Sequence, residues 1–219
     1  MHLLNHLYIL LLYYITFSLC GQVLKNCTSL SEIIIGAGIE ALGTIDLEST
    51  VLKKINVSED NPVYSSEDCI FFDKLMKRLI RFPVDCDTVK YVIPSTVTEI
   101  DKNAFAGSKD LTYIIFPKSV SVIPQGLFSN CSSMKKIMIL NTECEINAEL
   151  SSDIEIAGYA GSTAEKYTTQ MSYTFIDIEA NDEPVPSEPS TAWNGVITDV
   201  NGDGSIDAID ASIILIYSA

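Results

Sequence analysis

Residues 92–114, VIPSTVTEIDKNAFAGSKDLTYI, are followed directly by residues 115–137, IFPKSVSVIPQGLFSNCSSMKKI, and both segments carry one pattern with a period of 23 residues. Apolar side chains and prolines recur at matching places: Pro94 and Pro117, Ile100 and Ile123, Phe105 and Phe128, Leu111 and Met134, Ile114 and Ile137. A fixed period of this length is the sequence signature of a stack of similar units. The repeat therefore decides the architecture of this part of the chain.

Each unit divides into three parts. An apolar turn, Pro-x-x-Val-x-x-Ile, comes first; a short helical or irregular stretch surrounds the Phe; a strand of the form Leu-x-x-Ile-x-Phe closes the unit. The apolar residues point inward on every coil, and a single coil cannot bury them, so the core forms between stacked coils. The sequence predicts an α/β repeat solenoid with a strand plus a short helix or irregular stretch per rung, a rung being one turn of the stack.

Degenerate copies of the strand phrase occur at residues 30–35 and 52–57. The phrases at residues 58–66, 69–74 and 158–167 also fit the pattern, and together these segments make residues 24–178 resemble leucine-rich repeat proteins of the BspA-like kind. The resemblance implies a leucine-rich repeat solenoid. It also implies surface adhesion and contact with a host or substrate rather than one reaction.

Other segments depart from the period. Residues 61–91 alternate apolar and polar side chains around a charged turn at 73–78, which predicts a hairpin inserted into a solenoid that spans 23–178. Residues 164–171 predict a short terminal helix and residues 173–178 a last strand, which together would cap the stack. The acidic, Pro-rich segment 179–192 is typical of an extended linker.

A second motif lies in the twelve residues 199–210, DVNGDGSIDAID. Its oxygen-bearing residues have the spacing of a calcium loop, and Gly204 stands at position 6, where the chain turns sharply. The predicted Ca²⁺ ligands are Asp199, Asn201, Asp203, Ser205 through its carbonyl oxygen, Asp207 and Asp210. Ca²⁺ prefers six to eight oxygen ligands, so the donor set suits the ion.

A mostly apolar run, residues 208–217, follows this loop and is long enough for about three helical turns. The loop and run, DVNGDGSIDAIDASIILIYSA, resemble a dockerin, a module that binds cohesins on cellulosomal scaffoldins. The resemblance implies cohesin contacts at Ala208, Ile209, Leu215 and Ile216. Dockerins have two such loop-helix repeats and this sequence has one, so residues 193–219 are interpreted as a partial dockerin.

Composition narrows the classes of function. The 219 residues are 47% hydrophobic, enough for a substantial core, and the formal net charge is −15. Nine of the acidic residues lie from Asp177 onward, where Lys and Arg are absent, and an acidic chain of this kind has no electrostatic footprint for nucleic acid. The two His, His2 and His6, lie in a segment expected to be removed, so a His-dependent nucleophilic mechanism is not expected.

That segment is the apolar run 7–19, which has the length of a signal-peptide core and is too short for a comfortable membrane span. Residues 1–22 are therefore interpreted as a signal-peptide-like segment, with an alternative in which the gene start is mis-assigned. Export implies a secreted or extracellular protein, associated with a cellulosome or a cell surface.

On the strands, residues between the inward Leu, Ile and Phe point to the opposite face. This alternation predicts a strip of basic and apolar side chains: Lys53, Lys54, Asn56, Thr112, Tyr113, Ile115, Lys135, Lys136 and Met138. Within it, Lys53, Lys54, Tyr113, Lys135 and Lys136 are the candidate partner-binding residues. The alternative is an ordinary solvated sheet face on which Lys blocks edge pairing.

The sequence therefore predicts an exported, non-catalytic accessory protein of polysaccharide degradation. It binds an unknown protein or glycan through its repeats and attaches to a scaffoldin cohesin through a Ca²⁺-dependent dockerin. Two alternatives stay open: a cell-surface adhesin with an inert dockerin remnant, and a hydrolase carried on the cellulosome.

Overall fold

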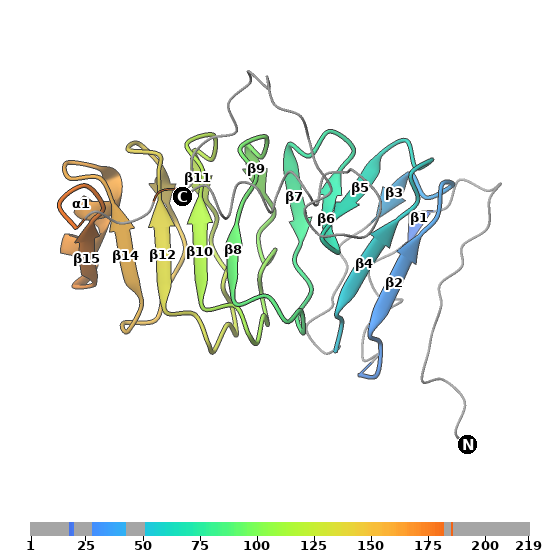
Figure 1. The fold of residues 1–219 in the computed structure, drawn as a ribbon, viewed down its shortest axis with the longest axis horizontal. Coiled ribbons are helices and arrows are strands. Elements are labelled where there is room, and N and C mark those ends of the chain that lie inside the picture. The colour runs from blue at the N-terminus through green and yellow to red at the C-terminus, as the bar shows by residue number, and fades with distance from the viewer. Residues whose placement is uncertain (1–17, 20–27, 43–50, 182–184, 186–219) are drawn as a thin grey trace, which may run out of the picture. The chain divides into compact units, whose positions relative to one another are not determined.

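The computed structural model describes residues 18–19, 28–42, 51–181 and 185. The chain divides into two units, residues 1–177 and 178–219, and every described helix and strand belongs to the first unit. In that unit short strands succeed one another along the stack, as Figure 1 shows from β2 to β15. Most of the predicted signal segment, most of the linker and all of the partial dockerin lie outside the described residues.

The central element is a five-stranded parallel sheet with the order β15-β14-β12-β10-β8. Its strands are β8 (Lys90–Val92), β10 (Tyr113–Phe116), β12 (Lys136–Ile139), β14 (Glu155–Gly158) and β15 (Thr174–Asp177). Ile114 pairs with Ile137, 23 positions on, as the repeat requires. The next step is shorter, because Lys136 pairs with Glu155. The predicted stack of repeats is thus confirmed, with shorter rungs at its C-terminal end.

Each regular rung has a second, two-residue strand, which follows a proline turn in the first two rungs and the proline-free turn 140–144 in the third. These are β9 (Glu99–Ile100), β11 (Val122–Ile123) and β13 (Glu145–Ile146), and β11 and β13 pair in parallel. The stretch around the Phe then consists of successive turns and contains no helix. The helical option for these stretches is wrong for the described rungs, because Asn103, Gly107 and Gly126 have positive φ angles that end a helical path. The irregular option describes these rungs, and the α/β class is not confirmed.

The repeated apolar residues form one buried core. Ile100, Phe105, Leu111 and Ile114 of one unit and their equivalents in the next all belong to this cluster. The ring of Phe105 lies 5.3 Å from that of Phe82 and stacks on Phe128 at 5.9 Å. Each rung therefore buries its aromatic residue against its neighbours rather than against itself.

An antiparallel segment interrupts the parallel stack within the predicted insertion. Its strands are β5 (Tyr64–Glu67), β6 (Ile70–Asp73) and β7 (Arg78–Arg81). β6 pairs antiparallel with both β5 and β7, and β7 then pairs in parallel with β9. The last strand of this antiparallel segment, β7, thus pairs with β9 of the first regular rung.

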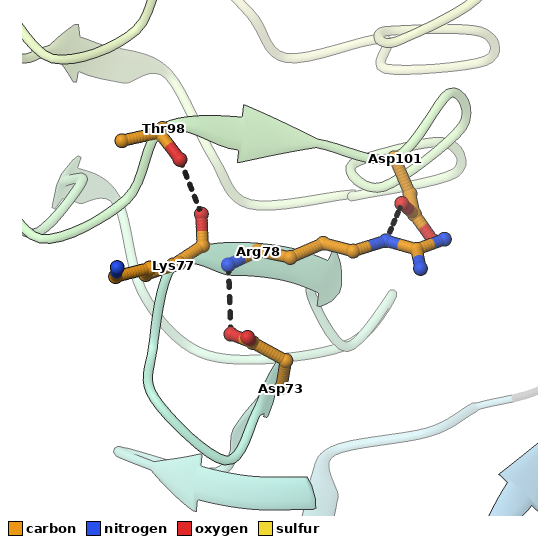
Figure 2. Close-up of polar contacts among 5 residues, drawn as sticks. All are labelled: Asp73, Lys77, Arg78, Thr98 and Asp101. Atoms are coloured by element: carbon orange, nitrogen blue, oxygen red, sulfur yellow. Dashed lines mark hydrogen bonds and ion pairs between the residues drawn. The ribbon is translucent and has the colours of Figure 1, made fainter. Parts of the chain in front are cut away.

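Polar contacts stabilise the junction between the antiparallel segment and the first regular rung, as Figure 2 shows. The Asp73 carboxylate accepts the Arg78 backbone N–H at 2.7 Å, which closes the turn between β6 and β7. The Lys77 carbonyl oxygen accepts the Thr98 N–H at 2.8 Å and also the Thr98 hydroxyl at 3.4 Å, the bond that Figure 2 draws. The Arg78 guanidinium pairs with Asp101 at the end of β9. The start of β9 is therefore fixed by the hairpin turn.

The N-terminal part of the unit has its own strands and core. The strands are β1 (Ser18–Leu19), β2 (Glu32–Ile35), β3 (Ala41–Leu42) and β4 (Lys54–Val57). β1 pairs in parallel with β3 and β2 with β4. Leu30, Ile33, Ile35, Ile55 and Phe71 contribute to a buried cluster separate from the main core.

The predicted terminal helix is confirmed as α1 (Thr163–Met171). The Ser162 hydroxyl accepts the Glu165 N–H, and the Glu165 carboxylate accepts the Gly161 N–H, so both side chains satisfy open backbone donors at the helix start. The helix ends at Ser172, which has a φ of 62°. No helix in the described part of the chain has the length and apolar character needed to cross a bilayer.

Candidate functional site

Three side chains meet at the start of neighbouring strands in the five-stranded sheet. Lys90, Tyr113 and Lys136 are paired in register on β8, β10 and β12. The Lys90 ammonium lies 5.0 Å from the centroid of the Tyr113 ring, and the Lys136 ammonium lies 5.4 Å from it. Each contact has cation–π geometry, worth about 0.5 to 1 kcal/mol where the groups are exposed. We call these residues the lysine-tyrosine cluster.

The strand pattern explains why these side chains share a face. Ile114 and Ile137 follow Tyr113 and Lys136 in the chain and lie in the main core. Because successive side chains of a strand point to opposite faces, Tyr113 and Lys136 point away from that core. Tyr113 and Lys136 are half-buried and Lys90 is exposed. Backbone pairing on both sides of β10 holds the tyrosine in place between the two lysines.

The same row continues with a carboxylate. Glu155 on β14 pairs in register with Lys136 and is exposed. The row therefore changes from two ammonium groups to one carboxylate along the sheet. A ligand that bears negative charge would be favoured at the Lys90 end of the row and opposed near Glu155.

The second row of the predicted strip is not an exposed surface. Ile115 and Met138 were expected on the contact face, but their side chains are 1% and 0% exposed. The Tyr113 ring contributes to this burial, since its hydroxyl lies 3.7 Å from the Met138 sulfur. Strand alternation predicts the face to which a side chain points. It does not predict whether a large neighbouring side chain shields that residue from solvent.

The predicted strip is also divided between two sheets. Lys54 lies on β4, where it pairs in register with Glu32 of β2, and Lys53 immediately precedes that strand. Tyr113 and Lys136 belong to the five-stranded sheet instead. The hairpin lies between the two sets in the sequence and breaks the regular parallel order, so the strip is not one continuous ladder.

Two of the predicted lysines pair with carboxylates. The Lys135 ammonium lies 3.2 Å from Asp153, and the Lys53 ammonium 4.0 Å from Asp87. Two side-chain hydrogen bonds lower the pKa of Asp153 below its ordinary value. The bond from Ser151 has the larger effect and the bond from Lys135 the smaller one. These pairs are largely exposed and offset part of the positive charge expected on the strip.

Sequence reasoning missed Lys90, which completes the cluster. It stands 23 positions before Tyr113, so the repeat period itself could have identified it. The residue was assigned instead to the hairpin insertion. The structure assigns residues 90–92 to the regular sheet.

The predicted Ca²⁺ ligands at residues 199–210 and the cohesin-contact residues 208, 209, 215 and 216 lie outside the described residues. Within residues 28–42 and 51–181, the structure brings together no group of three or more His, Cys, Asp or Glu suited to a metal ion.

Comparisons with known proteins address the repeat region. Residues 82–157 match the model of the BspA type leucine rich repeat region, in six copies. A leucine-rich repeat protein from Eubacterium ventriosum has a similar structure, with a TM-score of 0.52 and 22% identity over 61% of this chain and 37% of that chain. No curated protein matches the chain.

Two further solved structures are similar at lower TM-scores. A leucine rich cell surface protein from Faecalibacterium prausnitzii has a TM-score of 0.38 and 18% identity over 61% of this chain and 52% of that chain. A leucine-rich repeat protein from Bacteroides ovatus has a TM-score of 0.34 and 22% identity over 66% of this chain and 43% of that chain.

This chain spans less than two thirds of the length of each of these proteins, and none of the matched descriptions names a catalytic family. The 23-residue register, the shared core and the matched model agree on one family of repeats. Residues 82–157 are a BspA-type leucine-rich repeat region, folded as a solenoid like that of the Eubacterium ventriosum protein.

Proposed function

We propose that this chain is a non-catalytic, cell-surface or secreted binding protein whose repeat stack recognises an acidic segment of a partner protein. The observation that carries the proposal is the convergence of the Lys90 and Lys136 ammonium groups on the Tyr113 ring. Tyrosine is enriched among the residues that dominate protein–protein binding energy, and ammonium groups attract carboxylates.

The sheet makes this arrangement suited to binding. All three residues sit on strands paired on the parallel ladder, so little backbone freedom is lost when a partner docks. The formal net charge of −15 means that the chain as a whole repels an acidic partner, so a local positive site directs where such a partner docks. Glu155 sets one limit of the site.

Poly-L-glutamate is a suitable probe of this charge preference. We expect the protein to bind it at low salt, and we expect Lys90→Glu with Lys136→Glu to reduce the affinity at least tenfold in calorimetry. Lys118→Glu with Lys166→Glu, at two exposed positions outside the cluster, is the charge-matched control and should cause a smaller loss. Equal losses in the cluster and control variants would contradict the proposal.

A second proposal concerns the C-terminal motif. We infer that residues 199–210 bind Ca²⁺ and that this segment, with the apolar run 208–217, attaches the protein to a cohesin of a cellulosomal scaffoldin. The support is the donor set: four Asp carboxylates and one Asn carboxamide at calcium-loop spacing suit a hard cation. When bound, Ca²⁺ would neutralise the repulsion among these carboxylates and so order the loop.

The ligand residues give the test. Asp199→Ala or Asp203→Ala should abolish Ca²⁺ binding measured by calorimetry and Ca²⁺-dependent binding to cohesin modules. Glu188→Gln, an acid of the linker segment, is the control and should leave both unchanged. Cohesin binding that persists in the Asp variants, or in chelator, would contradict this attachment.

The adhesin alternative predicts a different pattern. Binding to cells or to a host protein that is insensitive to chelator, together with no cohesin binding under either condition, would favour a surface adhesin with an inert C-terminal motif. Turnover of a plant-wall polysaccharide would favour the hydrolase alternative and contradict the non-catalytic proposal.

A further inference from the structure

A polar groove of about 650 Å³ lies on the turn segments that follow β9, β11 and β13. It crosses three successive rungs, which we call the turn-side groove. Its lining residues are Lys102, Asn103, Gln125, Gly126, Phe128, Ser129, Asn130, Glu149, Leu150 and Ser151. Adjacent rungs of a parallel stack lie about 4.8 Å apart, so three rungs extend the groove over about 10 Å.

Contacts between rungs shape the middle of the groove. The Gln125 side-chain amide donates to the Glu149 carboxylate at 3.3 Å and links the second rung to the third. Gly126 has a φ of 75°, and a Cβ at this position would lie 2.7 Å from the Asn103 side-chain oxygen. The absence of a side chain at Gly126 therefore allows the Asn103 carboxamide to lie close to the groove floor.

Two tyrosines of the C-terminal cap, which comprises α1 and the segment after it, fix the third rung of the groove. The hydroxyls of Tyr167 and Tyr173 donate to the carbonyl oxygens of Ala148 and Leu150, both at 2.7 Å. The two rings stack at 5.7 Å. These bonds fix the backbone on both sides of Glu149, so its carboxylate is presented from a rigid segment.

The lining is chemically unlike an apolar ligand pocket. It contains three side-chain carboxamides, those of Asn103, Gln125 and Asn130, and each carries both donors and acceptors. Ser129 and Ser151 add hydroxyls, and the single positive charge of Lys102 is balanced by Glu149. Phe128 is only 8% exposed and Leu150 is half-buried, so these two residues supply the smaller, apolar part of a mainly polar lining.

We propose that the turn-side groove binds a short neutral carbohydrate segment of about two sugar rings, laid across the rungs. Sugar hydroxyls also donate and accept at once, so they match a row of carboxamides, hydroxyls and one carboxylate. The formal charges of the lining cancel, which disfavours a strongly charged ligand. Most lining side chains are exposed, so binding rests on hydrogen bonds and is weak per site.

This inference does not depend on the lysine-tyrosine cluster, which belongs to the sheet. The probes are neutral cello-, xylo- and manno-oligosaccharides, with oligogalacturonate as the acidic comparator, titrated into ¹⁵N-labelled protein produced in a bacterial host. Shifts are expected for the backbone amide of Gly126 and for the side-chain amides of Asn103, Gln125 and Asn130, with at least one neutral oligosaccharide. Oligogalacturonate should cause smaller shifts.

Two variants remove lining groups without disturbing the backbone. Gln125→Ala is at an exposed position, and Asn130→Gly suits the φ of 61° at residue 130. The double variant should weaken binding of the responding oligosaccharide at least tenfold. Ser121→Ala, an exposed hydroxyl on the same stack outside the groove, is the control. The Lys90→Glu with Lys136→Glu variant should bind the sugar like the unaltered protein.

No response to any neutral oligosaccharide would overturn the proposal, as would binding that the groove variants leave unchanged. A stronger response to oligogalacturonate than to every neutral probe would overturn the assignment of a neutral ligand. Denaturant unfolding of each variant establishes that it is folded, so a loss of binding is attributed to the groove.

Discussion

The side-chain amide of Asn61 donates to the carbonyl oxygen of Gly36 at 2.8 Å, although 25 positions separate the two residues in the chain. The same amide donates to Ile39, and the Asn61 side-chain oxygen accepts the N–H groups of Val63 and Tyr64. Asn61 is completely buried, and its side chain satisfies the backbone groups of two loops at once. It therefore joins an N-terminal turn to the start of the hairpin.

Asn61→Ala is expected to lower the free energy of unfolding by about 3 kcal/mol, because it leaves several buried backbone groups without partners. Urea denaturation measures the effect. Asn147→Ala is the control, since Asn147 is exposed and its side chain donates to the nearby Glu145 carboxylate, and it should change stability by less than about 0.5 kcal/mol. Similar losses for both variants would contradict the role of Asn61.

Arg78 and Asp101 form a two-pronged ion pair between β7 and the end of β9 (Figure 2), with N···O distances of 2.5 and 2.9 Å. Asp101→Asn should cost up to about 1 kcal/mol, since the pair is partly exposed and solvent screens it. The loss should shrink as salt is added. Asp87→Asn breaks the longer, more exposed pair with Lys53 and should have no measurable effect.

Tyr167 makes the stability of the cap depend on alkaline pH. Burial, and then the neighbouring Tyr173, raise the pKa of Tyr167 from 10.0 to about 12. The folded state keeps this proton where the unfolded chain loses it. The stabilisation is therefore complete below pH 10 and is lost as the pH rises toward 12.

Tyrosinate absorbance should show a late titration to which Tyr167 and Tyr91 both contribute, since burial also raises the pKa of Tyr91. Tyr167→Phe should lower the amplitude of this late titration and remove the hydrogen bond to Ala148. The variant should unfold at lower urea at neutral pH and depend less on pH in the alkaline range. Tyr159→Phe serves as the control, because Tyr159 lies outside the stacked pair. A Tyr167→Phe protein with the pH dependence of the unaltered chain would contradict this assignment.

Cys144 should resist alkylation in the folded protein. Its side chain is fully buried in the main core, and burial raises the pKa of its thiol from 9.0 to about 11. The thiolate is the reactive form, so native Cys144 should react with iodoacetamide far more slowly than the half-buried Cys86. Peptide mass spectrometry before and after denaturation checks this order, which equal native rates would contradict.

The sequence predicts the repeat fold well because its signal is local and periodic. Ile114 and Ile137 are apolar at one spacing, and strand pairing then aligns them in register. The helix at the C-terminal end was also predictable, since Ser162 and Glu165 form a start signal readable from the chain. The option of a helix within each rung was wrong, because the positive φ angles at Asn103 and Gly126 are a feature of the tight turns.

The candidate site was predictable only in part. Tyr113 and Lys136 follow from strand alternation, whereas Lys90 fell within the predicted insertion 61–91, although it pairs in register with Tyr113. Burial of Met138 depends on the neighbouring Tyr113, and this is a property of packing rather than of spacing. Lys53 and Lys54 belong to another sheet, because the antiparallel hairpin breaks the regular order.

By itself the sequence determined the 23-residue period, the inward apolar residues and the spacing of a calcium loop, because each is a pattern along the chain. Only the tertiary structure decided which side chains meet across rungs: Lys90 and Lys136 over Tyr113, Asn61 against Gly36, and Gln125 with Glu149. These contacts between rungs depend on the register of the strands, on where the shorter rungs begin and on which residues are shielded from solvent by neighbouring side chains. These quantities are set when the coils stack, since each coil buries its apolar face only against the next.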